Sequence, residues 1–534
     1  MVEAAPHVRG LGRLVGNPSV TKSDNIVSVA QLTLSSKNPT ATKADALIIG
    51  VAKTSDGAAI IGDQLPPEFV QQLETLSTTL SITGAPDEVR KLPAPEAVSA
   101  GVLVLTGLGE RDDEGAFKAE TLRRAAGAAI REVAGSASAV IALPTLSDDD
   151  VAAVAEGALL GAYAISGLKS DEEAIAKAAP VETIEINTQF TRSQRAKAAA
   201  ERAEVLAEAV HATRDLVNTP SNLLFPATFA EAAKAAVKDA TAKGAKGLKV
   251  TVLDDRALLA GGYGGIMGVG QGSARPPRLV KVAYTPAKAS GDMAQIGLIG
   301  KGITFDTGGI SIKPSASMEQ MTMDMAGAAA VLHTTIAAAR LALPVAVTAY
   351  LCLAENMPGG GAMRPGDVIT IRGGKTVEVI NTDAEGRLVM ADGLVAAIED
   401  GHDTVIDIAT LTGAQMAALG ARTAGVMGTD CVRTALHEAA EAAGESNWPM
   451  LLPDYLATGL KSNVADMMNV SNERLAGMQV AGLFLSKFVG DTPWGHLDIA
   501  GPAWNTGSPY GYLGKAATGY GVRTLLKYLE TRAA

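Results

Sequence analysis

Short apolar runs alternate with longer amphipathic segments along the first 190 residues. Residues 46–51 (ALIIGV), 101–105 (GVLVL) and 139–143 (AVIAL) are rich in aliphatic side chains, as buried strands are. Over 117–133 and 149–164, apolar residues recur every three or four positions, which predicts helices. This alternation predicts an α/β domain whose sheet is largely parallel.

One long helical pattern covers residues 192–217 and stops at 218–222 (NTPSN), a helix terminator followed by a loop. Beyond it, strands and helices alternate again, with glycine-rich loops that carry the unusual polar residues. We therefore predict an α/β protein with two domains. These are a smaller N-terminal α/β domain (1–190) for assembly and access, a connecting helix (191–217) and a larger C-terminal catalytic α/β domain (218–534) with a central mixed sheet flanked by helices.

Two glycine-containing segments resemble nucleotide-binding loops only superficially. Residues 106–109 (TGLG) follow a strand, but so short a pattern predicts an ordinary turn. Residues 261–272 (GGYGGIMGVGQG) lack a clear preceding strand and an acidic residue at the ribose distance, so we expect a mobile or tightly turning loop.

The amino-acid composition limits which metal ligands and which binding partners the chain can have. The 534 residues contain two cysteines, Cys352 and Cys431, and six histidines without ligand-like spacing, so any metal must be held mainly by carboxylates. The net charge of −11 argues against a nucleic-acid surface. No apolar run approaches the ~20 residues of a membrane helix, so we expect a cytoplasmic protein that does not enter the membrane.

Three segments place charged residues directly after β-rich runs, where α/β sheets usually keep their sites. Lys301, Asp306 and Lys313 lie among glycines, Asp324 lies among methionines before an alanine-rich helix, and Asp383 and Glu385 precede another helix. If these carboxylates converge, they repel one another unless cations neutralise them. Two divalent metals would do so, but the residue types leave Mg²⁺, Mn²⁺ and Zn²⁺ open.

Each of these residues also has a simpler interpretation. Asp324 and Asp383 stand where helix caps are expected, and Lys301 and Lys313 taken singly would be surface or ion-pair lysines. The methionines around Asp324 would be core packing, and His496 would be a buried hydrogen-bonding residue rather than a ligand.

Residues 381–388 (NTDAEGRL) resemble the signature octapeptide of the cytosol leucine aminopeptidase family, the dinuclear-metal exopeptidases. The segments around 301–313, 324, 218–222, 409–413 and 496–501 also match that family in residue type, order and spacing. The resemblance covers essentially all of 218–534, whereas the first 190 residues match only in size and α/β character.

The resemblance implies a leucyl aminopeptidase, a metallo-exopeptidase that removes leucine and other mainly apolar residues from peptides with a free N-terminus, in intracellular peptide turnover. Two divalent ions, Mn²⁺ or Zn²⁺, would share a hydroxide that attacks the peptide. Their ligands would be Lys301, held neutral, with Asp306, Asp324, Asp383 and Glu385.

The same resemblance implies roles for the neighbouring residues. Lys313 would stabilise the oxyanion, and Arg387 would hold a bicarbonate ion that acts as the general base. Two further sets complete the site: Gly386 and Leu411 beside the bicarbonate, and Met321, Thr410, Gly413, Ala500 and Ala503 around the substrate side chain. The small Ala503 would widen that pocket and relax a strict preference for leucine.

Family members assemble as hexamers, each a dimer of trimers, so we expect a homohexamer. Some bacterial members also bind DNA as hexamers, which leaves an additional DNA-binding or architectural role as the alternative. A scaffold that has lost catalysis is disfavoured, because all seven catalytic and ligand positions are intact.

Overall fold

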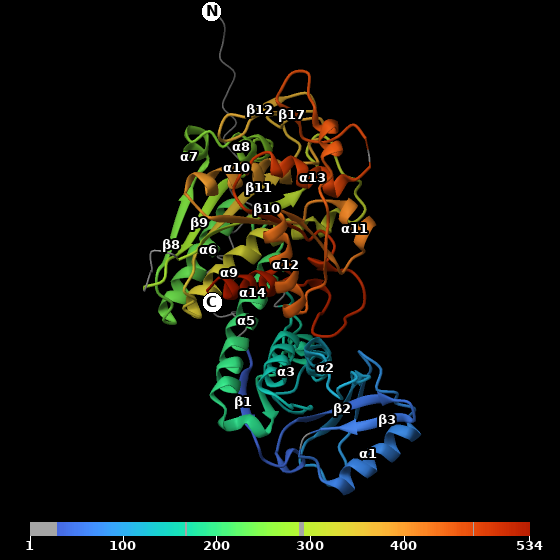
Figure 1. The fold of residues 1–534 in the computed structure, drawn as a ribbon. Coiled ribbons are helices and arrows are strands. Elements are labelled where there is room, and N and C mark those ends of the chain that lie inside the picture. The colour runs from blue at the N-terminus through green and yellow to red at the C-terminus, as the bar shows by residue number, and fades with distance from the viewer. Residues whose placement is uncertain (1–28, 63, 166–167, 288–292, 474, 534) are drawn as a thin grey trace, which may run out of the picture.

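The computed structural model describes residues 29–62, 64–165, 168–287, 293–473 and 475–533. Two large sheets organise this part of the chain, one in the lower part of the molecule and one within its upper part in Figure 1. Helix α5 (Gln194–Asn218) runs between them and packs on helices of both. The predicted combination of a smaller N-terminal and a larger C-terminal α/β unit is confirmed.

The N-terminal sheet contains seven strands among the described residues, in the order β1-β7-β6-β2-β5-β4 with β3 paired to β2. Its pairings are parallel except those of β3 and β4. The elements are β1 (Gln31–Ser35), β2 (Ala46–Thr54), β3 (Gly57–Ile61), α1 (Pro67–Thr79), β4 (Val89–Pro93), β5 (Val102–Gly109), α2 (Ala119–Glu132), β6 (Ser138–Ala142), α3 (Asp148–Gly161), α4 (Glu172–Ala178) and β7 (Thr183–Asn187), with short 3-10 helices η1 (Pro39–Ala41) and η2 (Gln189–Arg192).

Strand β2 shows why this sheet is covered on both faces. Ala46 and Ile48 belong to the core formed with α2 and α3, whereas Leu47 and Ile49 belong to the core formed with α1. Because successive side chains of a strand point to opposite faces, a continuous apolar run indicates burial on both sides. The sequence prediction of a buried strand here is confirmed.

The C-terminal sheet is mixed, as predicted, and within the described residues it has eight strands in the order β16-β15-β18-β14-β10-β11-β9-β8. The central strands β18, β14, β10 and β11 are mutually parallel, and β8, β9 and β15 pair antiparallel to their inner neighbours. The strands are β8 (Leu248–Leu253), β9 (Arg278–Tyr284), β10 (Gln295–Asp306), β11 (Ala346–Asn356), β14 (Thr404–Ala409), β15 (Ala424–Gly428), β16 (Asn447–Pro449) and β18 (Trp494–Asp498).

Helices cover both faces of the mixed sheet. Helices α5, α6, α9, α12 and α14 contribute to the core on one face, and α8, α10 and α13 to the core on the other. The remaining elements are α6 (Pro226–Ala242), α7 (Asp255–Ala260), α8 (Gly264–Gly270), η3 (Met318–Met325), α9 (Ala326–Arg340), β12 (Val368–Thr370), β13 (Thr376–Glu378), α10 (Gly386–Glu399), α11 (Gly413–Leu419), α12 (Asp430–Ala443), η4 (Asp454–Leu460), β17 (Met467–Met468), α13 (Gly477–Ser486), β19 (Trp504–Asn505), β20 (Ala516–Ala517) and α14 (Val522–Ala533).

Two local predictions were wrong. Residues 106–109 do not form a turn but continue β5 to its end at Gly109. Within the glycine-rich segment 261–272, residues 264–270 form helix α8 rather than a loop. No helix in the described ranges is both long and apolar enough to cross a membrane.

Candidate metal centre

The four parallel central strands end at one edge of the mixed sheet, and polar residues occupy the ends of three of them. Asp306 ends β10 opposite Asn356, which ends β11, and Asp498 ends β18 opposite the last residue of β14. Carboxyl edges of parallel strands are where α/β sheets commonly bind ligands. The fold therefore gathers residues far apart in sequence at this edge.

Three buried carboxylates lie at this edge, one from each predicted segment. Asp306 comes from β10, Asp324 from the 3-10 helix η3, and Glu385 from the residue that precedes α10. One carboxylate oxygen of each lies within 4.8 Å of those of the other two. This spacing is suited to a shared cation.

Two lysines connect these carboxylates. Lys301 Nζ lies 2.7 Å from Asp324 Oδ1 and 2.9 Å from Glu385 Oε1. Lys313 Nζ lies 2.8 Å from Asp306 Oδ2 and 2.5 Å from Asp383 Oδ1. Asp383 thus stands outside the group of three and is joined to it through Lys313.

The site concentrates charge in a buried space. Burial, helped by the nearby Asp306 and opposed by the lysines, raises the pKa of Asp324 to about 6 and that of Glu385 to about 8. Burial opposes the charge on Lys301 and Lys313, but the surrounding carboxylates outweigh it and raise the pKa of both lysines. Four carboxylates against two ammonium groups leave negative charge in excess, which favours a cation.

The donor atoms present fit a divalent metal. Asp324 Oδ2 and Glu385 Oε2 are buried and have no hydrogen-bond partner among the described residues. Buried oxygens without a partner are costly, and a cation bound to them would remove that cost. Oxygen donors suit Mg²⁺ and Mn²⁺, and Zn²⁺ also accepts carboxylates.

Glycines let the elements of the site approach closely. A Cβ added to Gly327 in α9 would lie 2.1 Å from the carbonyl oxygen of Ile408, so α9 can pack against the sheet only with glycine there. A Cβ on Gly386 would lie 2.5 Å from Lys301 Cε. Gly386 therefore makes room for the Lys301 side chain.

Neither Asp324 nor Asp383 is the helix cap that the simpler interpretation predicted. Helix α9 begins at Ala326 with Met325 as its N-cap, and α10 begins at Gly386 without a side-chain cap. Asp324 instead accepts hydrogen bonds from Lys301 and from Thr410 Oγ1, the latter at 2.7 Å. His496 is buried with Nδ1 2.5 Å from Asp407 Oδ1, which is the hydrogen-bonding arrangement predicted for it.

Arg387 lies buried beside this cluster. Its Nη1 donates to the Asn469 carbonyl oxygen at 2.7 Å, while its Nε is buried without a partner among the described residues. Burial lowers the pKa of Arg387 to about 10, with Glu385 and Asp498 opposing that shift. A guanidinium with a free N–H can still bind a planar oxyanion.

Some of the residues predicted beside the bicarbonate or the substrate form hydrogen bonds at the site, whereas the others are located only by the elements that carry them. The Thr410 carbonyl accepts from Lys301 at 2.9 Å, and Leu411 and Ala500 both donate backbone N–H groups to Asp498 Oδ1. Three more residues are placed by their elements: Met321 in η3, Gly413 at the start of α11, and the buried Ala503 after β18.

Sequence reasoning missed two buried asparagines that hold the site together. Asn356 Nδ2 donates to Asp306 Oδ1 at 2.8 Å and to the Thr382 carbonyl at 3.0 Å. Asn469 accepts from the Ile380 N–H at 2.8 Å and donates to the Asn381 carbonyl at 2.7 Å, so it anchors the octapeptide. The sequence feature that could have indicated a role for Asn356 is its position at the end of a buried strand.

Known proteins match the chain over both domains. The family model described as "Cytosol aminopeptidase family, catalytic domain" matches residues 211–526, and the one described as "Cytosol aminopeptidase family, N-terminal domain" matches residues 34–172. A probable cytosol aminopeptidase from Streptomyces griseus is 50% identical over 518 residues, covering 94% of this chain and 99% of the relative. One from Streptomyces coelicolor is 50% identical over 520 residues, with the same shares covered.

Solved structures agree with these relatives. The bottromycin maturation enzyme BotP in complex with Mn has a TM-score of 0.79 at 35% identity, covering 92% of this chain and 100% of its own. A tomato leucine aminopeptidase mutant has a TM-score of 0.80 at 30% identity, covering 94% and 96% respectively. Fold, carboxylate cluster and relatives together define a metal-dependent peptidase of the hydrolase class. The chain belongs to the cytosol aminopeptidase family.

Proposed function

We propose that the chain is a leucyl aminopeptidase that removes leucine and other mainly apolar residues from peptides with a free N-terminus. The observation that carries this proposal is the group of buried carboxylates at the sheet edge, which form ion pairs with two lysines. When bound, a pair of divalent metals supplies an activated water and polarises the scissile carbonyl.

Five side chains would hold the metals, Mn²⁺ or Zn²⁺: Lys301, Asp306, Asp324, Asp383 and Glu385. Lys301 must release its proton to act as a ligand, because only a neutral amine has a lone pair to offer. Its carboxylate neighbours favour the ammonium form, so binding of metal and loss of this proton would be linked.

Lys313 would remain a cation and bind the oxyanion of the tetrahedral intermediate. Its side chain is 22% exposed, against 4% for Lys301, so it is the lysine more open to a substrate. Its amine stays positioned by Asp306 and Asp383 while the substrate approaches.

Arg387 would hold bicarbonate as the general base, with the backbone around Gly386 and Leu411 completing the binding site. The unpaired, buried Nε of Arg387 supports this role, since a bicarbonate oxygen would satisfy it. The bicarbonate would accept a proton from the attacking water and return it to the leaving amine.

The substrate side chain would lie among Met321, Thr410, Gly413, Ala500 and Ala503. The buried Ala500 and Ala503 offer small apolar walls, and nothing would lie within 4 Å of a Cβ on Gly413. This open, apolar lining supports a preference for leucine together with tolerance for bulkier side chains.

Hydrolysis of leucine p-nitroanilide, with Mn²⁺ or Zn²⁺ added, tests the proposal. We expect Glu385→Gln and Lys313→Ala each to lower kcat by at least about a hundredfold. Lys238→Ala changes an exposed lysine on α6 and should retain full activity. Normal activity in both site variants would exclude this mechanism.

Metal analysis separates binding from catalysis. Wild type and Lys313→Ala should each carry about two metals per chain, whereas Glu385→Gln should carry fewer, since Glu385 is a proposed ligand. Addition of bicarbonate should raise the activity of the wild type and leave that of Arg387→Ala unchanged.

We also propose that the protein works as a homohexamer in the cytoplasm. Several large apolar side chains of residues 448–464 are exposed, including Trp448 at 60%, Leu451 at 68% and Tyr455 at 73%, which supports a contact with another subunit. The DNA-binding alternative would need a local basic patch, for which Arg192, Arg195 and Lys197 are the candidates. It has less support, because Arg195 pairs with Asp149 at 2.9 Å. Light scattering and a salt-dependent mobility shift test the two ideas.

A further inference from the structure

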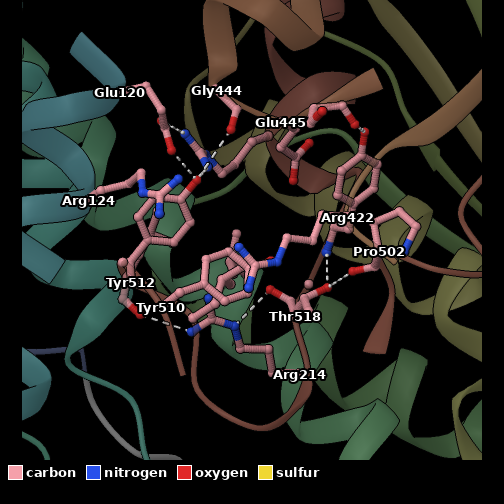
Figure 2. Close-up of a pocket in the computed structure, with 18 of the residues that line it drawn as sticks. Glu120, Arg124, Arg214, Arg422, Gly444, Glu445, Pro502, Tyr510, Tyr512 and Thr518 are labelled. Atoms are coloured by element: carbon pink, nitrogen blue, oxygen red, sulfur yellow. Dashed lines mark hydrogen bonds and ion pairs between the residues drawn. The ribbon is translucent and has the colours of Figure 1, made fainter. Parts of the chain in front are cut away.

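A cavity of about 340 Å³ lies where the N-terminal domain meets the catalytic domain (Figure 2). Helix α2, the C-terminal half of α5 and the segment before α14 all contribute to its wall. None of the proposed metal ligands lines it. Four of the lining side chains are arginines: Arg124, Arg214, Arg422 and Arg523.

Two of these arginines already have anionic or polar partners. Arg124 forms an ion pair with Asp87. Arg523 lies 3.6 Å from Glu120 and donates to the Tyr512 hydroxyl at 2.5 Å. Glu445, which also lines the cavity, accepts the backbone and side-chain hydrogen bonds of Thr524 at the start of α14. Arg124, Arg523 and Glu445 therefore already have partners within the protein.

Arg214 forms no ion pair with a described residue. It is 2% exposed, and its Nε and Nη1 donate to the carbonyl oxygens of Thr518 and Leu160, each at 2.9 Å. Its Nη2 has no hydrogen-bond partner, and no carboxylate pairs with it, within the ranges the structure describes. A buried cation that has carbonyls, the Tyr163 ring 5.1 Å away and the charge of Asp215 without a direct ion pair is costly to maintain.

Arg422 is the second of the four cavity arginines that forms no ion pair with a described residue. Its guanidinium lies 3.6 Å from the centre of the Tyr510 ring, which holds the otherwise exposed side chain against the cavity. Figure 2 shows Arg422, Tyr510 and Arg214 next to one another in the cavity wall. Stacking leaves the N–H groups at the edge of the guanidinium free to donate.

We propose that this interdomain cavity binds a small oxyanion, a carboxylate or phosphate group, through Arg214 and Arg422. Arginine N–H groups match the geometry of such anions, and a bound anion would neutralise the buried charge of Arg214. The volume is at the low end for ligand pockets, so the ligand is an inorganic ion or a small metabolite rather than a peptide. The site does not depend on the proposed aminopeptidase mechanism.

Binding would stabilise the folded protein, because the anion contacts groups that the unfolded chain does not hold together. The full-length protein with its metals is titrated with phosphate or with propionate, each against chloride at equal ionic strength, and the thermal unfolding midpoint is recorded. We expect a saturable rise beyond that given by chloride. Saturation by phosphate identifies a phosphate ligand, and saturation by propionate alone identifies a carboxylate.

Variants of the lining arginines test whether the rise in the unfolding midpoint arises in this cavity. Arg422→Ala, at an exposed position, should weaken apparent binding by about tenfold. Lys515→Ala removes an exposed cation outside the cavity, on the loop that carries Tyr510, and should change nothing. Arg214→Met should abolish the response; if that variant does not fold, Arg422→Ala decides. The proposal is overturned if no saturable rise occurs, or if the rise is the same in Arg422→Ala as in wild type.

Discussion

At the scale of single residues, Asn356 shows how the metal centre is held in place. Its amide connects Asp306 on β10 to the carbonyl oxygen of Thr382 in the octapeptide loop. Two segments that supply proposed ligands are thereby fixed relative to each other. Residues that orient ligands without touching the metal often matter nearly as much as the ligands.

We predict that Asn356→Ala lowers kcat/KM for leucine p-nitroanilide and metal affinity by about 10- to 100-fold. The thermal midpoint should fall only modestly, since the change removes two hydrogen bonds. Steady-state kinetics and metal titration measure the two effects, with Asn505→Ala, an asparagine of β19, as the control. Unchanged metal affinity would show that Asp306 keeps its position without this amide.

A second residue, His211 in α5, sets the response of stability to acid. Burial, together with the neighbouring Arg214, lowers the pKa of His211 to about 3. The unfolded chain binds a proton here below about pH 6.5, while the folded chain does not until about pH 3. The contribution of His211 to the free energy of unfolding therefore falls as the pH drops below 6.5.

At pH 5, this residue should cost the folded state about 2 kcal/mol relative to pH 7.5. His211→Gln cannot titrate, so its unfolding free energy should fall less between these two pH values than that of wild type. Urea denaturation at each pH measures the difference. Parallel losses in the two proteins would mean that His211 is protonated in the folded state.

The carboxylates that the structure brings together could be predicted from sequence, whereas the two asparagines left a much weaker signal. Asp383 and Glu385 stand in a specific octapeptide, and the shortage of cysteine and spaced histidine directed attention to carboxylates. Asn356 and Asn469 carry no charge and fall in no short motif. Their importance follows from pairing across the sheet and from burial, which depend on the fold.

At the scale of elements, the start of α10 controls access to Lys301. Gly386 touches the lysine so closely that an added Cβ would lie 2.8 Å from Nζ. Any larger residue must displace the Lys301 side chain or tilt the helix. The glycine of the octapeptide thus serves the metal centre as well as the helix.

We predict that Gly386→Ala weakens metal binding by at least tenfold, because Lys301 is displaced. Alanine is the better helix former by about 1 kcal/mol, so loss of helix propensity cannot explain a loss of binding. Metal titration followed by calorimetry measures the affinity. Gly360→Ala, where an added Cβ meets nothing within 4 Å, is the control and should bind metal normally; equal binding in both variants would contradict this account.

Two glycine-containing segments differ from their predicted structure because their glycines permit close packing. A Cβ on Gly107 would lie 1.9 Å from the Ala85 carbonyl oxygen, so this glycine allows close packing inside a strand rather than a turn. Gly265 of α8 would similarly meet the Leu388 carbonyl oxygen of α10 at 2.2 Å. Helix-on-helix packing thus stabilises a helix whose composition alone disfavours it.

At the scale of the whole molecule, charged residues connect the two domains. Arg202 of α5 lies 2.6 Å from Glu156 of α3 and 2.6 Å from Glu530 of α14. Arg123 of α2 adds a 2.7 Å ion pair to Glu156. The guanidinium groups of Arg123 and Arg202 outweigh burial and lower the pKa of Glu156.

We predict that Arg202→Met destabilises the protein by about 3–5 kcal/mol, because it leaves Glu156 and Glu530 without a shared cation. The double variant Arg202→Met with Glu530→Gln should recover part of this loss. Thermal and urea unfolding measure both. Arg195→Met, at an exposed ion pair, should cost less than about 1 kcal/mol; an equal cost at both arginines would show that the network does not join the domains.

The two-domain organisation could be predicted from alternating patterns, but this network could not. Arg202 and Glu530 are 328 residues apart, and no local pattern relates them. The predicted boundaries at 190 and 217 remain proposals, although α5 occupies nearly the predicted helix. The N-terminal domain, which matched its family from sequence only in size and α/β character, matches the family model of that domain.

The strand order has a consequence for synthesis of the chain on the ribosome. Strand β18, at residues 494–498, lies between β14 and β15, which are made about 70 to 90 residues earlier. Until β18 leaves the ribosome, those two strands each present an unpaired edge to other nascent chains. The complete sheet behind the proposed site therefore forms only when translation is nearly complete, and until then its unpaired edges make the unfinished chain an aggregation hazard.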